Sequence, residues 1–200
     1  MGFDPKKVIE WGMSLPLMSN ERGIMAAFGI YAAMNFNEFF FSTVSKIMHM
    51  AKEEDALEIE NKLYQAVLDC AYYTFHGART SVDWQDYIAP MIKTKEDELL
   101  ALVAFTNIFG VGYINVVDLI PGEKLVTEVK NAYDPPRYIE EFGIQKRARC
   151  YMFAACTAAC MDLVYGPKFP NGIGTFKAKE VLCIAKGDPI CRFIATPKNT

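Results

Sequence analysis

Three residues in the last fifth of the 200-residue chain have the types and spacing of metal ligands: Glu180, Cys183 and Cys191. They lie in 175–196, where two runs rich in β-branched and aromatic side chains flank turn-forming residues at 186–189. This pattern predicts a β-hairpin. Opposed residues in a hairpin have Cβ atoms roughly 4.5 to 5.5 Å apart, so the two thiols could bind the same metal ion. Glu180 would point to the other face of a flat strand, so joining the site requires a bulge or strong local twist.

A tetrahedral zinc site needs a fourth donor, and thiolate-rich sites are typical of this ion. Cys150, Cys156 and Cys160 lie in 145–165, which is predicted to form a helix that ends at Gly166. At 100° per residue Cys156 and Cys160 share a face, whereas Cys150 points elsewhere, so only one of these sets can face the hairpin. Basic neighbours and the helix dipole favour a thiolate at Cys150, which is therefore the better chemical candidate.

Unpaired cysteines are also among the most buried residues, and core packing is the simpler interpretation of Cys70, Cys156 and Cys160. For Cys183 with Cys191, the predicted hairpin and the nearby acid favour metal binding over core packing. The first residues lack the long apolar stretch of a secretory signal, so we expect a cytoplasmic protein. A reducing cytoplasm argues against a disulfide.

These residues resemble the C-terminal signature of the 4-vinyl-reductase (hydrocarbon-binding) domain family. The match comprises Glu180, Cys183, Gly187, Cys191, Arg192 and Phe193. The family includes aromatic-sensing domains of some bacterial transcription activators, and its fold is related to that of the vesicle-tethering TRAPP subunits. In the sensor branch a zinc is held by this Glu, these two Cys and a Cys at the head of the preceding helix.

The resemblance therefore implies a zinc held by Cys150, Glu180, Cys183 and Cys191. Cys150 is followed by an aromatic residue and, at the family's spacing, by Gly166. The link from Gly166 to Glu180 is longer than in the family, which keeps Cys156 as the alternative fourth ligand.

Helical patterns dominate the first half of the chain. They predict helices over 4–15, 21–34, 37–51, 54–75 and 95–109, with a short segment capped by Ser81 between the last two. From Gly112 the period changes, and 113–120 with 124–132 predict a second hairpin before further helices reach Tyr165. This order predicts an α+β fold in which an antiparallel sheet of two hairpins packs against helices. The resemblance implies the same, a TRAPP-like ligand-binding fold. We divide the chain into a helical N-terminal segment, 1–52, and a ligand-binding domain with the zinc site, 53–200.

Composition excludes several classes of partner. The net charge of −3, with charges scattered, provides no basic face dense enough for nucleic acid. The longest apolar run, 24–34, is far shorter than the roughly 20 residues that span a bilayer, so we expect no membrane span. The first fifty residues contain more apolar side chains than one small core can bury. Part of this apolar surface is therefore expected to contact a second copy of the chain, which predicts a homodimer.

The sequence contains no complete catalytic set. It has no Ser-His-Asp pattern, dinucleotide fingerprint or phosphate loop, and neither of its two histidines adjoins a plausible nucleophile. The favoured function is a module that binds or senses a small hydrophobic or aromatic ligand and carries a structural zinc, and catalysis is not favoured. The aromatic residues predicted to line the pocket are Trp84, Phe105, Phe109, Tyr113 and Phe176. The alternatives are an accessory enzyme, either a reductase of tetrapyrrole synthesis or a small-ring hydrolase, and a scaffold subunit.

Overall fold

The computed structural model describes residues 3–15, 18–27, 30–32 and 37–198. The chain begins with α1 (Pro5–Ser14) and a small hairpin of β1 (Met25–Ala27) and β2 (Ile30–Ala32). A helical arm follows, made of α2 (Asn37–Phe40), the π-helical turn η1 (Phe41–Ser45) and α3 (Lys46–Met50). The next helical elements are α4 (Glu53–Thr80), α5 (Val82–Tyr87), η2 (Ala89–Met91), α6 (Lys95–Thr106) and η3 (Asn107–Phe109). The remainder comprises β3 (Tyr113–Ile120), β4 (Lys124–Lys130), α7 (Asp134–Phe142), α8 (Tyr151–Tyr165), β5 (Phe176–Leu182), η4 (Ile184–Lys186) and β6 (Cys191–Pro197).

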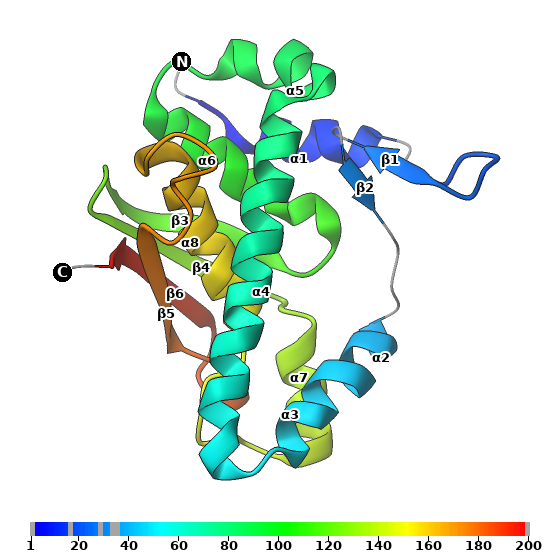
Figure 1. Ribbon diagram of the computed structural model, residues 1–200, viewed down its shortest axis with the longest axis vertical. Helices are drawn as coiled ribbons and strands as arrows, with labels where there is room; N and C mark the ends of the chain where they lie inside the picture. The colour runs from blue at the N-terminus through cyan, green and yellow to red at the C-terminus, as the bar shows by residue number, and fades with distance from the viewer. Residues whose placement is uncertain (1–2, 16–17, 28–29, 33–36, 199–200) are drawn as a thin grey trace.

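The architecture is α+β, as predicted. The two expected hairpins, β3–β4 and β5–β6, join through β4 and β6 into one antiparallel sheet of order β3-β4-β6-β5. Helix α8 packs on this sheet against β4, β5 and β6, and the long helix α4 packs on α8 (Figure 1). Most residues of α8 are buried, because the helix is covered by the sheet on one side and by α4 and α6 on others. None of the described helices combines the length and hydropathy needed to cross a bilayer.

Local signals set several helix boundaries. Asp4 accepts a hydrogen bond from the Lys6 amide with Pro5 in the first position of α1, and Thr94 with Asp97 forms the predicted capping box of α6. Ser81 caps α5 by accepting from the Trp84 amide. These starts agree with the sequence prediction, because a capping side chain satisfies backbone donors that the helix itself leaves unpaired.

The predicted helix over 21–34 is wrong within the described residues. Met25 pairs with Ala32, and Ala26 with Tyr31, in the β1–β2 hairpin; 28–29 and 33–34 lie outside the described residues. Before the hairpin, the Asn20 side chain accepts from the amides of Arg22 and Ile24, which holds a turn that a helix could not continue through. Among its described residues, the N-terminal segment is therefore helical over α1 and the arm 37–50 only.

Two further boundaries differ from the prediction. Helix α4 runs past Gly77 to Thr80, because packing against α8 outweighs the modest cost of glycine in a helix. Residues 145–150 are not helical, and α8 begins only at Tyr151. The Gln145 amide donates to the carbonyl of Ala185 in η4, which ties this segment to the tip of the β5–β6 hairpin.

Candidate metal centre and adjoining cavity

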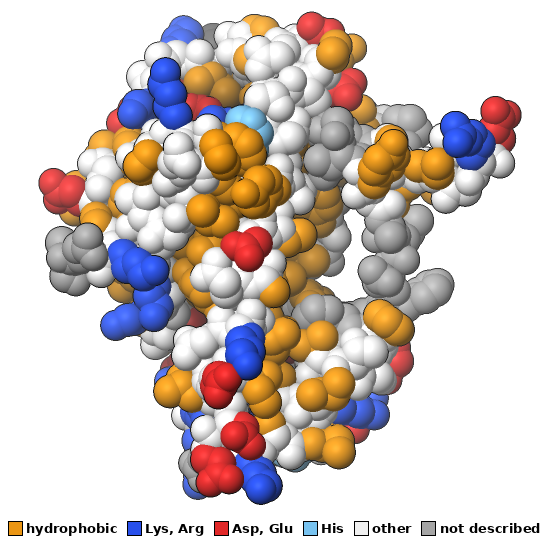
Figure 2. All heavy atoms as spheres, viewed as in Figure 1, with side chains coloured by type: hydrophobic (Ala, Val, Ile, Leu, Met, Phe, Trp, Pro, Cys, Tyr) orange, Lys and Arg blue, Asp and Glu red, His pale blue; other side chains and the backbone are white. Residues whose placement is uncertain are grey.

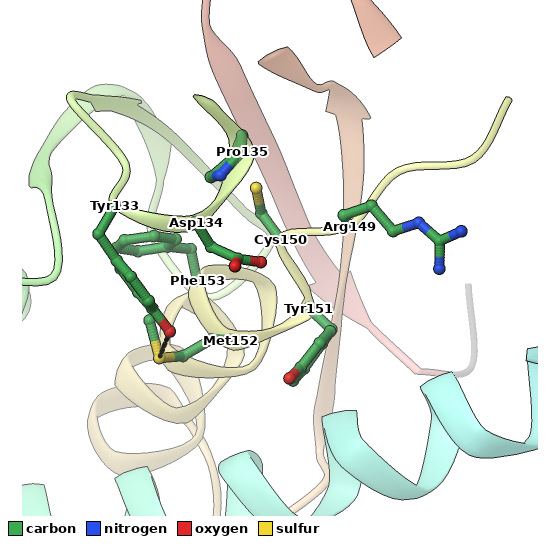
Figure 3. Close-up of a pocket in the computed structure, with 8 residues that line it drawn as sticks. All are labelled: Tyr133, Asp134, Pro135, Arg149, Cys150, Tyr151, Met152 and Phe153. Atoms are coloured by element: carbon green, nitrogen blue, oxygen red, sulfur yellow. Dashed lines mark hydrogen bonds between the residues drawn. The ribbon is translucent and has the colours of Figure 1, made fainter. Parts of the chain in front are cut away.

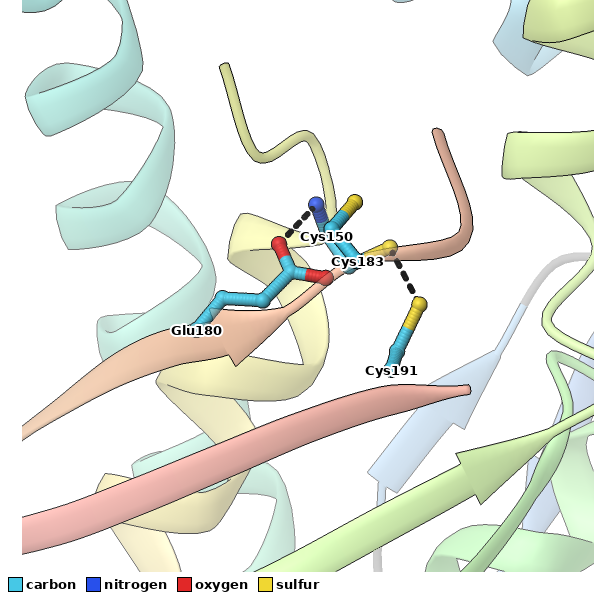
Figure 4. Close-up of side chains that lie close together, drawn as sticks. All are labelled: Cys150, Glu180, Cys183 and Cys191. Carbon is cyan, nitrogen blue, oxygen red and sulfur yellow. Dashed lines mark hydrogen bonds between the residues drawn. The ribbon is translucent and has the colours of Figure 1, made fainter. Parts of the chain in front are cut away.

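Four predicted ligands converge where the start of α8 meets the β5–β6 hairpin (Figure 4). The ligand atoms of Cys150, Glu180, Cys183 and Cys191 all lie within 4.8 Å of one another, and the three cysteines are buried. The Sγ atoms of Cys150 and Cys191 are 3.4 Å apart. Cys156 is not part of this cluster, and Cys150 is the one of these two cysteines that the structure brings to the hairpin. The arrangement could hold a metal ion.

The hairpin contains the bulge that the prediction required. Glu180 pairs with Phe193 but Leu182 pairs with Arg192, so Val181 is an extra residue on β5. The extra residue reverses the alternation of side chains, which brings Glu180 to the same face as Cys183.

The tip of the hairpin is shaped by its own hydrogen bonds. Asp188 accepts from the Cys183 amide at 2.8 Å, and Gly187 adopts a left-handed backbone with φ of 90° that favours glycine. The Ile184 amide donates to Cys191 Sγ at 3.4 Å. An N–H group directed at this sulfur favours its thiolate, the form that binds metal.

Burial and close spacing disfavour ionisation of the whole cluster. Burial raises the pKa of Glu180 to about 8, and its Oε1 atom is buried with no hydrogen-bond partner, while Oε2 accepts from the Cys150 amide at 2.8 Å. Hydrogen bonds from Cys150 and Cys191 lower the pKa of Cys183, and the bond with Cys183 raises that of Cys150. Four acidic groups in one buried space cannot all ionise unless a positive ion neutralises them.

The basic residues beside Cys150 do not act as the sequence suggested. Arg147 and Arg149 pair with Glu60 of α4 at 2.6 and 3.4 Å. In Figure 3 the Arg149 guanidinium points away from the Cys150 sulfur. The expectation that these charges favour a Cys150 thiolate is therefore wrong. Instead, the two ion pairs hold the segment before α8 against α4.

A cavity lies beside the first turns of α8, next to the metal cluster. Its volume is about 290 Å³. Residues of α4, η3 and α8 form one wall, and residues of β2 form the facing wall. Hydrophobic side chains gather in the recess between α4 and the β1–β2 hairpin (Figure 2). The lining residues are Tyr31, Ala32, Val67, Cys70, Ala71, Thr74, Phe75, Thr106, Phe109, Val111, Met152, Phe153 and Cys156. None of them carries a charge.

The structure distributes the five predicted pocket residues among three places. Phe109 lines the cavity. Trp84, Phe105 and Phe176 lie in the core, where the Phe105 ring contacts Phe109 edge-on at 5.2 Å and Trp84 at 5.7 Å. Tyr113 lines a separate groove between α1, α6 and β3. Trp84 and Phe105 thus support the cavity wall from behind.

Sequence reasoning missed most of the cavity wall. Val67, Ala71 and Phe75 belong to the broad apolar stripe of α4. This stripe is wider than the surface that one packed helix covers, so it could have indicated a second apolar contact such as a cavity. Cys70 and Cys156 had been interpreted as core residues. Cys70 is instead exposed, whereas Cys156 is partly buried and packs against the core as expected, and both line the cavity.

Comparison with known proteins establishes the fold. No known family model and no curated protein sequence matches the chain. The phenol-responsive sensory domain of the transcription activator PoxR, solved with phenol, superposes with a TM-score of 0.74 at 12% identity, covering 96% of this chain and 89% of that one. The chain has the fold of this sensory domain. This confirms the expected relationship in fold to aromatic-sensing domains.

A vinyl-4-reductase family protein from Methanocaldococcus jannaschii is a weaker match. Its TM-score is 0.40 at 16% identity, covering 82% of this chain and 99% of that one. This score is too low to support an argument about function.

Proposed function

We propose that the protein is a binding or sensing module for a small uncharged apolar or aromatic molecule, with a structural zinc. The observation that carries the proposal is the cavity of about 290 Å³, walled by Phe75, Phe109 and Phe153, with no charged side chain among its described lining residues. An apolar cavity of about 150 Å³ already accommodates benzene, so this one has room for a substituted ring. The PoxR domain with the same fold is phenol-responsive, which supports a ligand of this class.

The polar atoms of the wall favour a neutral ligand. They belong to Tyr31, two threonines and two cysteines. Thr106 donates its hydroxyl hydrogen to the carbonyl of Leu102, and the hydroxyl of Thr74 lies 3.9 Å from the sulfur of Cys70. A charged ligand would lose its hydration without gaining an ionic partner here, which costs several kcal/mol.

We assign the cluster to zinc because it offers three sulfurs and one carboxylate, a donor set that suits this ion. Four protein donors leave no open position for water or substrate, so the bound zinc would be structural. The same property weighs against the accessory-enzyme alternative. Zinc would supply the positive charge that the buried Glu180 and cysteines lack.

A thermal-shift series tests the proposed ligand class. Toluene and phenol are expected to raise the melting temperature of the zinc-loaded protein, because each would bind the folded state alone and stabilise it by RT ln(1 + [L]/Kd). Benzoate, a ring of similar size that carries a charge, is expected to cause no shift. Equal stabilisation by benzoate and toluene would contradict a neutral apolar site.

We also propose that 1–52 mediates a homodimer and that 53–200 forms the ligand-binding domain, to whose cavity β2 adds Tyr31 and Ala32. The arm 37–50 exposes Phe39, Ile47 and Met50, which are 61%, 59% and 81% accessible. On its other side the arm packs on α7, where Phe41 and His49 contact the rings of Tyr138 and Phe142 and Ser45 donates to Asp134 at 2.8 Å. Light scattering at about 50 micromolar is expected to give the mass of a dimer, since an obligate dimer persists at such concentrations. A monomer mass there would count against this assignment.

A further inference from the structure

The first turn of α8 belongs to both the metal cluster and the cavity. Cys150 is the N-cap residue of the helix and contributes a sulfur to the cluster. Met152 and Phe153, two and three positions later, line the cavity. A helix rises about 1.5 Å per residue, so less than one turn of rigid backbone separates the two sites. A displacement of Cys150 would therefore move the cavity wall.

Phe153 is also held by the strand that carries another metal donor. Its ring packs against Phe193 at 6.0 Å between centroids, and Phe193 is two residues after Cys191 on β6. Residues two apart on a strand share a face, so the Cys191 and Phe193 side chains leave β6 on the same side. The position of the Phe153 ring thus depends on both elements that the metal would join.

The Phe153 ring also abuts Gly112. A methyl group at Gly112 would lie 3.1 Å from the Phe153 ring and 3.1 Å from Val129, so any side chain there would push on this ring. Met152 is the second cavity residue in the first turn of α8. Its sulfur accepts a hydrogen bond from the Tyr133 hydroxyl at 4.0 Å (Figure 3). Tight packing of this kind transmits a displacement and does not absorb it.

We propose that zinc at the cluster and an apolar ligand in the cavity strengthen each other's binding through the first turn of α8. The inference rests on the proposed ligand site. Zinc joins Cys150 to the hairpin donors and thereby orders the turn that carries Met152 and Phe153. A ligand that contacts these side chains then meets a wall that is already ordered, and by linkage the bound ligand favours zinc retention to the same degree.

The direct test measures zinc retention in the wild-type protein. Zinc-loaded protein is equilibrated with a competing chromophoric chelator, with and without saturating toluene. Toluene is expected to increase the apparent zinc affinity by about 5- to 150-fold, the range of typical coupling between two sites. An unchanged zinc affinity, with toluene binding confirmed by calorimetry in the same sample, would overturn the coupling and leave the ligand site intact.

A pair of glycine variants tests the same coupling without any ligand. Gly112→Ala is expected to weaken zinc binding at least about fivefold, although Gly112 is not one of the four donors. Gly110→Ala is the matched control, because Gly110 also has a positive φ, 70° against 148°, but a methyl group there meets nothing within 4 Å. Equal zinc affinity in the two variants would contradict the proposal.

If Gly112→Ala does not fold, Met152→Ala replaces it. This variant removes a cavity-wall side chain without overpacking and is also expected to weaken zinc binding.

If toluene does not bind the zinc-loaded wild type, the proposed function fails. The variants then decide alone whether the first turn of α8 affects the metal, and zinc affinity equal to wild type in both Gly112→Ala and Met152→Ala would overturn the coupling.

Discussion

Replacement of Cys191 by serine is expected to abolish stoichiometric zinc binding and to destabilise the fold. The Cys191 sulfur lies 3.4 Å from that of Cys150 and accepts the Ile184 amide, so it is central to the cluster. Zinc that binds only the folded state contributes about 4 kcal/mol when its free concentration is 1,000 times Kd. The variant loses this contribution and keeps a buried, poorly neutralised acidic cluster.

The measurement combines metal analysis with denaturant unfolding of chelator-free preparations. Cys70→Ser is the matched control, because Cys70 is exposed on α4 and is not one of the cluster donors. It is expected to keep about one zinc per chain and wild-type stability. Metal content that is the same in Cys191→Ser, Cys70→Ser and the wild type would refute the assignment of the cluster.

Replacement of Ala71 by phenylalanine is expected to block the cavity. Ala71 lies on α4 with its side chain at the cavity wall, so a phenyl group there occupies the space proposed for the ligand ring. Burial of a ring of this size contributes about 1.5 to 3 kcal/mol, so toluene binding is expected to weaken about 10- to 150-fold. The free energy of unfolding is expected to hold or rise, because the new ring fills an apolar void.

The control for this substitution is Ala66→Phe, which adds the same ring at an exposed position of the same helix. It is expected to bind toluene as the wild type does. If both variants bind toluene with wild-type affinity, the ligand does not occupy the cavity between α4 and α8, and another site must be sought.

The sequence was most informative where the determinants are local. Alternating side chains, turn formers and the offset of Glu180 from Cys183 predicted both the β5–β6 hairpin and its bulge. The capping residues of α1, α5 and α6 were also recognisable, because a cap depends on neighbours within a few positions. The family resemblance pointed to Cys150 as the fourth member of the cluster, and the structure places its sulfur with the other three ligand atoms.

Features that depend on distant contacts were not predictable in this way. Aromatic type alone could not distinguish Trp84, which is 2% exposed in the core, from Phe109 on the cavity wall, because the partners of both come from other elements. Arg149 lies beside Cys150 in the sequence, but its charge is directed to Glu60, 89 positions away. The segment 21–34 has an apolar composition compatible with either helix or strand, and pairing decided in favour of strands over Met25–Ala27 and Ile30–Ala32.

Calorimetric titration of the zinc-loaded wild type with toluene tests the central claim most directly. We predict saturable binding of one toluene per chain with a negative heat-capacity change, the signature of apolar surface leaving water. The affinity should fall in Ala71→Phe and be retained in Ala66→Phe. The absence of any saturable heat up to the solubility limit of toluene would contradict the account of this protein as a module that binds small apolar molecules.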